Sequence, residues 1–115
     1  MIEDILIEKY AKFGRVSPSR EIYLPINLRE KFVNDCTELN VAIIGIELFH
    51  MQECYVIPVN PISGIDSSEL LRKYERWEDI VKECNRLALY VLNEEEKEDN
   101  TLYFNPCIFE ENKWK

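Results

Sequence analysis

Histidine, glycine and clustered cysteine are scarce in this sequence, and each scarcity argues against a class of function. His50 is the only histidine, which leaves no histidine metal cluster and a single imidazole for acid–base chemistry. The three glycines are isolated, so no glycine-rich loop is present to hold a phosphate. The cysteines form no CxxC pair of the kind that binds zinc; they are Cys36, Cys54, Cys84 and Cys107. We therefore expect a protein without a metal or a cofactor.

Long hydrophobic runs are also missing. A membrane-spanning helix needs roughly 20 predominantly apolar residues, and no run of that length occurs. The opening segment, MIEDILIEKY, carries acidic residues where a secretory signal peptide has basic ones. We therefore expect a cytosolic protein that does not engage a membrane, with thiols that stay reduced and pack as small hydrophobic side chains.

Basic residues are fewer than acidic residues. The 115 residues include 14 Lys and Arg against 22 Asp and Glu, which gives a formal net charge of −8. That charge repels nucleic acid, because neutralisation of phosphates by basic residues dominates nucleic-acid affinity. The same field speeds association with a basic partner, and nucleases are prominent basic proteins because they grip phosphates. Acidity is also typical of proteins whose charge serves only solubility.

The composition fits one folded domain spanning residues 1–115. Hydrophobic residues make up 46% of the chain, which is enough for a core. The apolar spacing predicts a first helix over Ile2–Phe13 and a second from Asn27, acting as its N-cap with Glu30, to near Asn40. The prolines between these helices indicate a connection, in which residues 22–24 can form a short edge strand.

A strand pattern follows the second helix. The run VAIIGIELFHM is rich in β-branched residues and predicts a central strand from Val41. A hairpin return is expected over residues 54–59, where Pro58 favours a sheet edge. Gly45 indicates a bulge or a close approach, and we expect a helix ring to pack over it. Residues 60–68 are typical of a loop.

The strongest local pattern is that of a long helix. Apolar residues recur at steps of three and four from Leu70 to Val91, which predicts a helix that starts near Asp66 or Ser67 and ends near Asn93. The acidic residues 94–100 are then expected to form a loop. Acidic side chains beside a helix C-terminus oppose the helix macrodipole, and this indicates a use in partner binding. A final strand is predicted over residues 101–109.

Together these elements predict an α+β fold, with a small, mainly antiparallel sheet against which two N-terminal helices and one long helix pack. The serines and thiols compete for the single imidazole, and His50 lies late in a strand, where a structural role is more typical than a catalytic one. The carboxylates match no calcium-loop pattern. We predict that the protein is not an enzyme.

Three stretches, in this order, resemble the bacterial polymorphic-toxin immunity proteins, in particular the family called immunity protein 40. LNVAIIGIELF resembles that family's apolar strand leading to a glycine and then a carboxylate, here Gly45 and Glu47, although Ile46 stands where the family has a second glycine. ERWEDIVKECNRLALYVLNEE resembles its long helix, and NTLYFNPCIF resembles its closing strand.

The resemblance implies a non-enzymatic cytoplasmic inhibitor of the kind found in contact-dependent growth inhibition, which binds a cognate toxin domain one to one and blocks its active site or substrate surface. The charge favours a basic nuclease as the toxin, because carboxylates can mimic phosphates. Two other hypotheses stay open: an acidic adaptor or regulatory subunit with no toxin partner, and a small hydrolase that uses His50. The candidate toxin-binding residues are acidic side chains after the long helix and near the hairpin, namely Glu94, Glu95, Glu96, Glu98, Asp99, Glu47 and Glu53.

Overall fold

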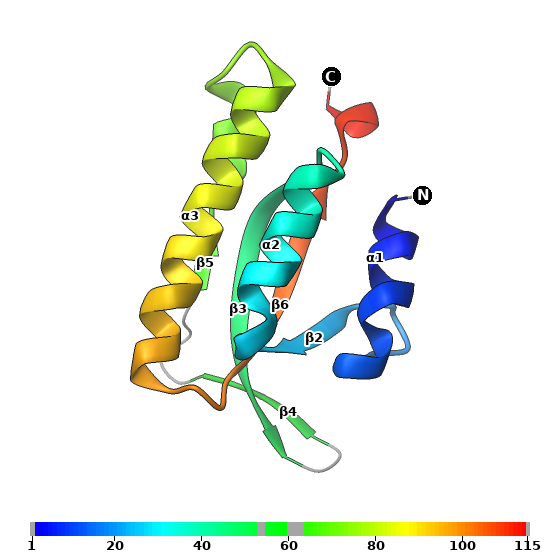
Figure 1. Cartoon of the computed structure of the whole chain (residues 1–115), viewed down its shortest axis with the longest axis vertical. Coiled ribbons are helices and arrows are strands. Elements are labelled where there is room, and N and C mark those ends of the chain that lie inside the picture. The colour runs from blue at the N-terminus through cyan, green and yellow to red at the C-terminus, as the bar shows by residue number, and fades with distance from the viewer. Residues whose placement is uncertain (1, 53–54, 60–63, 115) are drawn as a thin grey trace.

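The protein folds as an antiparallel sheet with its α-helices on one face (Figure 1), which confirms the predicted α+β class. The computed structural model describes residues 2–52, 55–59 and 64–114. The helices are α1 (Ile2–Tyr10), α2 (Arg29–Glu38) and α3 (Trp77–Glu98). The strands are β1 (Arg15–Val16), β2 (Ile22–Pro25), β3 (Ala42–Gln52), β4 (Tyr55–Pro58), β5 (Gly64–Asp66) and β6 (Tyr103–Phe109). No helix of the described residues is long and apolar enough to span a membrane.

Strand β3 organises the sheet, as the predicted central strand. The strand order is β1-β2-β6-β3-β4, and β5 is a further partner of β3. The hairpin with β4 pairs Phe49 with Pro58 at the far end of β3, and β5 pairs with the middle of β3. On its other edge β3 pairs with β6, from Ala42 opposite Phe109 to Phe49 opposite Tyr103.

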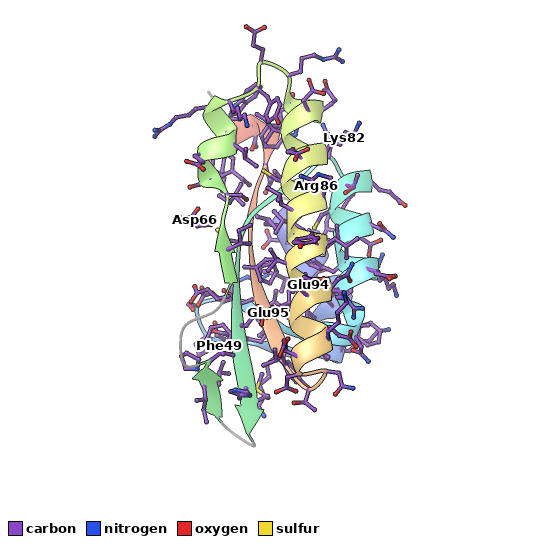
Figure 2. All side chains as sticks on the ribbon, turned by 90° about the vertical axis from the view of Figure 1, so that its left-hand side faces the viewer. Phe49, Asp66, Lys82, Arg86, Glu94 and Glu95 are labelled. Carbon is purple, nitrogen blue, oxygen red and sulfur yellow. The ribbon has the colours of Figure 1, made fainter. Side chains whose placement is uncertain are left out.

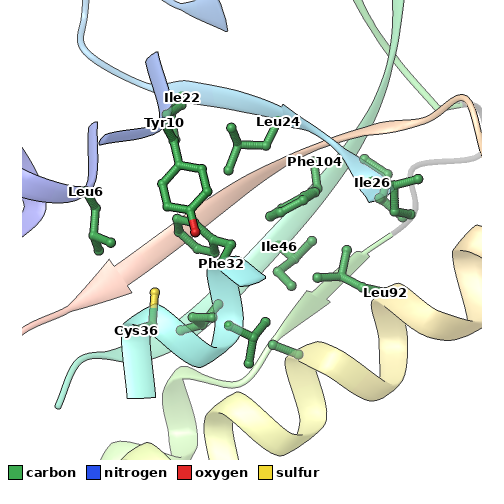
Figure 3. Close-up of a cluster of buried hydrophobic side chains, with 14 of the residues drawn as sticks. Leu6, Tyr10, Ile22, Leu24, Ile26, Phe32, Cys36, Ile46, Leu92 and Phe104 are labelled. Carbon is green, nitrogen blue, oxygen red and sulfur yellow. The ribbon is translucent and has the colours of Figure 1, made fainter. Parts of the chain in front are cut away.

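The main core lies between the sheet and the helices (Figure 3). Its centre is a row of aromatic rings, in which Phe32 of α2 contacts Tyr10 of α1 at a centroid distance of 5.3 Å and Phe104 of β6 at 5.8 Å. Both contacts are edge-to-face, which is the favoured geometry for aromatic pairs. The core therefore fixes α1 and α2 on the same face of the sheet.

A second cluster of buried hydrophobic side chains packs the N-terminal half of α3 against the sheet. Trp77 is buried, its indole N–H donates to the carbonyl of Asn40 at 2.8 Å, and its ring lies 5.5 Å from that of Trp114. Farther along α3 the buried Asn85 accepts from the Ile43 N–H at 2.8 Å and donates to the Val41 carbonyl at 3.0 Å. A polar side chain in the apolar stripe thus satisfies backbone groups at the start of β3.

The helix boundaries differ from expectation in several places. Helix α1 ends at Tyr10, because Ala11–Phe13 form a 3-10 helix, and α3 continues past the expected end near Asn93 to Glu98. Helix α3 begins at Trp77 because residues 68–72 form a separate 3-10 helix and Arg76 is extended, with φ −109° and ψ 134°. Helix α2 begins at Arg29, because a 3-10 turn occupies Ile26–Leu28. Its N-cap is Leu28 without a side-chain hydrogen bond, so the expected Asn27 cap is wrong.

The strands bring two further corrections. Residues 64–66, expected as loop, form β5, while the register shift between Ile43 and Gly45 confirms a bulge. The atoms nearest to a Cβ built on Gly45 are the Cys107 Cβ at 3.4 Å and the Ile65 carbonyl oxygen at 3.6 Å. Neighbouring strands, and not a helix ring, therefore approach this glycine.

Candidate protein-binding surfaces

Five of the seven predicted partner-binding residues gather at the C-terminal end of α3. Glu94, Glu95, Glu96 and Glu98 belong to the helix itself and Asp99 is its C-cap. Of the loop expected over residues 94–100, residues 94–98 are therefore helix instead. We call these five residues the acidic end; Figure 2 shows Glu94 and Glu95 on α3. Glutamate and lysine have high helix propensity, which outweighs the unfavourable macrodipole here.

Two basic side chains relieve part of the charge at the acidic end. Lys97 Nζ lies 2.9 Å from Glu94 one turn away, and Arg29 of α2 lies 3.7 Å from Glu96. Arg29 also donates from Nε to the Asn93 side-chain oxygen at 2.6 Å. The five carboxylates and these two basic groups leave a net charge of −3, to which the helix C-terminus adds about half a negative charge.

Asp99 closes the acidic end with a local hydrogen-bonded turn. Its carboxylate accepts from the Thr101 backbone N–H at 2.9 Å and from the Thr101 hydroxyl at 2.6 Å. These bonds, with a smaller contribution from the charge of His50, hold the pKa of Asp99 below its ordinary value. Asp99 therefore stays ionised to lower pH than an ordinary aspartate.

The other two predicted residues are not part of this cluster. Glu53 lies outside the described residues. Glu47 is exposed on the opposite side of the sheet, because residues 45, 47 and 49 of β3 alternate with Ile46 and Leu48, which point into the core. Figure 2 shows Phe49 and Asp66 on this side, away from α3. We call it the helix-free face.

Two similar tripeptides pair at the centre of the helix-free face. Gly45-Ile46-Glu47 of β3 runs antiparallel to Gly64-Ile65-Asp66 of β5, so that Gly45 is opposite Asp66 and Glu47 is opposite Gly64. Each glycine therefore faces the carboxylate of the other tripeptide. The two isoleucines pair on the helix side, where both contribute to the core. We call this arrangement the glycine–acid ladder.

A shallow hollow lies over the glycine–acid ladder. Its volume is about 470 Å³, and Asn105 and Cys107 of β6 line it beside Gly45, Glu47 and Asp66. Gly45 lines the hollow without a side chain, and the two acidic residues stand at diagonal positions around it. The Ser68 N–H donates to Asp66 Oδ1 at 3.0 Å, which orients that carboxylate and lowers its pKa.

Aromatic side chains extend the helix-free face from Glu47 toward β2. The Tyr23 ring contacts the Phe49 ring edge-to-face at 5.1 Å, and Tyr103 is the β6 neighbour of Phe49. Burial, followed by the charges of Glu21 and Glu47, raises the pKa of Tyr23. The face thus combines partly buried aromatic rings with negative potential.

Of the groups considered for catalysis, Cys107 lines the hollow on the helix-free face, whereas His50 and two buried thiols lie elsewhere. His50 follows Phe49 and so points to the helix side, where its charge acts on Asp99. Cys36 and Cys84 are buried thiols, as predicted, and burial raises the pKa of each, which disfavours the nucleophilic thiolate. Cys107 is exposed, contrary to the expectation of a buried thiol, and Cys54 lies outside the described residues.

Of the residues that shape the helix-free face, Gly45 and Glu47 were predicted from the sequence, whereas Asp66, Asn105 and Tyr23 were not. The signal for Asp66 was present in the repeated Gly-Ile-acid pattern at residues 45–47 and 64–66.

Among the described residues no group of three or more His, Cys, Asp or Glu side chains is placed to hold a metal ion. Comparison with known proteins found no matching family, no similar curated protein and no similar solved structure.

Proposed function

We propose that this chain is a non-enzymatic inhibitor of the immunity-protein type, which binds one basic toxin domain, of the nuclease class, and covers the surface that holds the toxin's substrate. The observation that carries the proposal is the acidic end of α3. Five acidic residues occupy the last helical turns and the C-cap, and two basic side chains offset them only in part.

The physical basis is complementarity to a surface that binds phosphates. A nuclease presents Lys and Arg to its nucleic acid, and carboxylates on a folded domain can occupy the same positions. The net charge of −8 extends this attraction beyond direct contact and speeds association. Exposed acidic groups such as Glu94 and Glu98 act chiefly by speeding association, because a direct ion pair at an exposed position contributes little binding free energy in water.

The direct test is capture of the partner from the native bacterium with the affinity-tagged full chain, followed by identification of the bound protein. We expect a basic toxin domain encoded beside this gene, whose nuclease activity falls to background with one equivalent of the purified chain. A basic nuclease from an unrelated source is the control and should keep its activity, because charge alone does not give a specific complex.

Two results would contradict the proposal. Capture of a partner without toxic activity would instead support the acidic adaptor. Turnover of a substrate by the purified chain, lost in His50→Ala, would support the hydrolase.

A further inference from the structure

We propose that the helix-free face is the surface that docks the toxin, and that an arginine side chain of the toxin is seated in the hollow over Gly45, between Glu47 and Asp66. This inference rests on the proposed function for the identity of the partner. It assigns the specific contact to a different face from the acidic end of α3.

The register of the glycine–acid ladder places the two acidic residues at neighbouring positions on the sheet. Glu47 is opposite Gly64, and Asp66 is two residues further along β5, so the acidic residues are diagonal neighbours. Such neighbours are about 7–8 Å apart in an antiparallel pair. One planar guanidinium, with five N–H donors, can approach both carboxylates across that distance, whereas a lysine ammonium offers a single compact charge.

The backbone at position 45 does not require glycine. A Cβ on this residue would make only ordinary van der Waals contacts, at 3.4 Å and 3.6 Å. The position therefore has room for a side chain, and glycine leaves that room empty. Gly64 differs, because its φ of +142° and a Cβ contact of 2.0 Å with the Ile46 carbonyl oxygen require glycine.

The charges on this face favour a cationic guest. Within the part of the chain that the structure describes, neither Glu47 nor Asp66 forms an ion pair with a basic side chain. Arg15, which pairs with Tyr23 and so shares this face, lies at the other edge of the sheet, on β1. An incoming arginine would therefore meet two carboxylates without displacing an internal partner.

The surroundings of the hollow suit an interface better than the acidic end does. Tyr23 and Tyr103 are partly exposed on strands and offer rigid aromatic contact area beside Glu47, and the buried Phe49 contacts the Tyr23 ring and pairs with Tyr103. Aromatic residues dominate binding hot spots, and arginine stacks on aromatic faces. Nucleic acid is disfavoured as the occupant, because its phosphates would meet Glu47 and Asp66.

The test uses a small probe and the full chain labelled with ¹⁵N. N-acetyl-arginine methylamide is titrated while amide chemical shifts are followed, and the neutral isostere N-acetyl-citrulline methylamide is the control. We expect saturable shifts at Gly45, Glu47, Asp66 and Asn105 with the arginine probe only. Shifts centred on residues 94–99, equal shifts with both probes, or no shifts at any soluble concentration would overturn the assignment.

Matched variants show which carboxylate holds the probe. Glu47→Gln should weaken binding about tenfold, and Gly45→Ala should weaken it by filling the hollow. Glu38→Gln, at an exposed position at the end of α2, should leave it unchanged. The amide spectrum of each variant reports whether it is folded. Loss of binding in Glu38→Gln with retention in Glu47→Gln would refute the proposal. If the probe binds at the ladder but the captured partner is not a toxin, the surface stands and the proposed function fails.

Discussion

Arg29 at the start of α2 and Asn93 in the last third of α3 are joined by a hydrogen bond of 2.6 Å from the guanidinium Nε to the amide oxygen. The same guanidinium lies 3.7 Å from Glu96 and donates to the Ile26 carbonyl at 3.2 Å. One side chain thus ties the acidic end of α3 to the 3-10 turn before α2. This link explains how a helix end rich in like charges stays ordered.

Arg29→Met should loosen that end. The arginine is largely buried, with 18% of its side chain exposed, so losing its bonds should lower the free energy of unfolding by about 1–2 kcal/mol. Arg86→Met is the control, because Arg86 pairs with Glu83 while 58% exposed, and its cost should stay below about 0.5 kcal/mol. Urea unfolding measures both, and equal costs would show that Arg29 does not anchor the helix.

The two glycines of the ladder should respond oppositely to alanine. Gly64→Ala should destabilise the fold by about 1–3 kcal/mol, because the residue has positive φ and a Cβ would meet the Ile46 carbonyl oxygen. Gly45→Ala should be neutral or stabilising by up to about 1 kcal/mol, because glycine inside a strand costs conformational entropy. Thermal or urea unfolding of the two variants decides this, and a large loss in Gly45→Ala would contradict the description of the hollow.

Asn85 should be the costliest asparagine to remove from a helix. Asn85→Ala leaves the Ile43 N–H and the Val41 carbonyl without their side-chain partner, which should lower stability by about 2–4 kcal/mol. Asn34→Ala, at an exposed position of α2, is the matched control, with an expected change below about 0.5 kcal/mol. Similar urea midpoints for the two variants would argue that the Asn85 amide contributes little.

The stability should depend on pH through Asp35. Burial acts to raise the pKa of this carboxyl, but hydrogen bonds from Lys9 and Tyr10 prevail and lower it. A folded-state pKa below the unfolded value of about 3.9 stabilises the protein above that pH, and this contribution is lost as the pH falls through the folded-state pKa.

Asp35→Asn should therefore flatten the unfolding free energy below about pH 5, measured by urea unfolding across a pH series. Tyr10→Phe removes one donor and keeps Lys9, so it should retain part of the slope. An unchanged slope in Asp35→Asn would show that other carboxylates cause the acid sensitivity.

The acidic end should govern the rate of association with the captured toxin. Reversing Glu94 and Glu98 to lysine should slow association about tenfold at low salt and make it less salt-dependent, with little change in dissociation. Glu69 and Glu75 reversed together give the same change of net charge at the other end of α3. Stopped-flow or surface binding kinetics compare the association rates of the two double variants. Equal slowing in both would show that the acidic end acts only through the net charge of the protein.

The sequence predicted the fold class because its strongest patterns reflect burial. The stripe that includes Trp77, Val81 and Cys84, and the apolar run of β3, correspond to buried faces in the structure. The ends of α3 were less predictable. Leu70 continues the apolar spacing although it belongs to a 3-10 helix. Glu94–Glu98 belong to α3, where contacts of the distant Arg29 with Glu96 and Asn93 add to the helix propensity of glutamate and lysine. Neither effect is encoded in local spacing.

The candidate surface was predictable only in part, because it depends on pairing across the sheet. Glu47 was identified from its position after Gly45, but its relation to Asp66 requires the register of β3 with β5. Strand β5 is only three residues long and lies in a segment of turn-forming residues, so propensity favoured a loop. Hydrogen bonding to β3 overrides that preference, as tertiary context often does for short strands.

The position of β6 sets the timing of assembly during translation. This strand follows all the others along the chain, yet it separates β2 from β3. Until the ribosome has released residues 103–109, the β1–β2 pair has no partner and β3 exposes one whole edge of backbone groups. A nascent chain therefore acquires its finished sheet only after synthesis of β6, and the unpaired edge of β3 is the segment that a chaperone would have to shield in the interval.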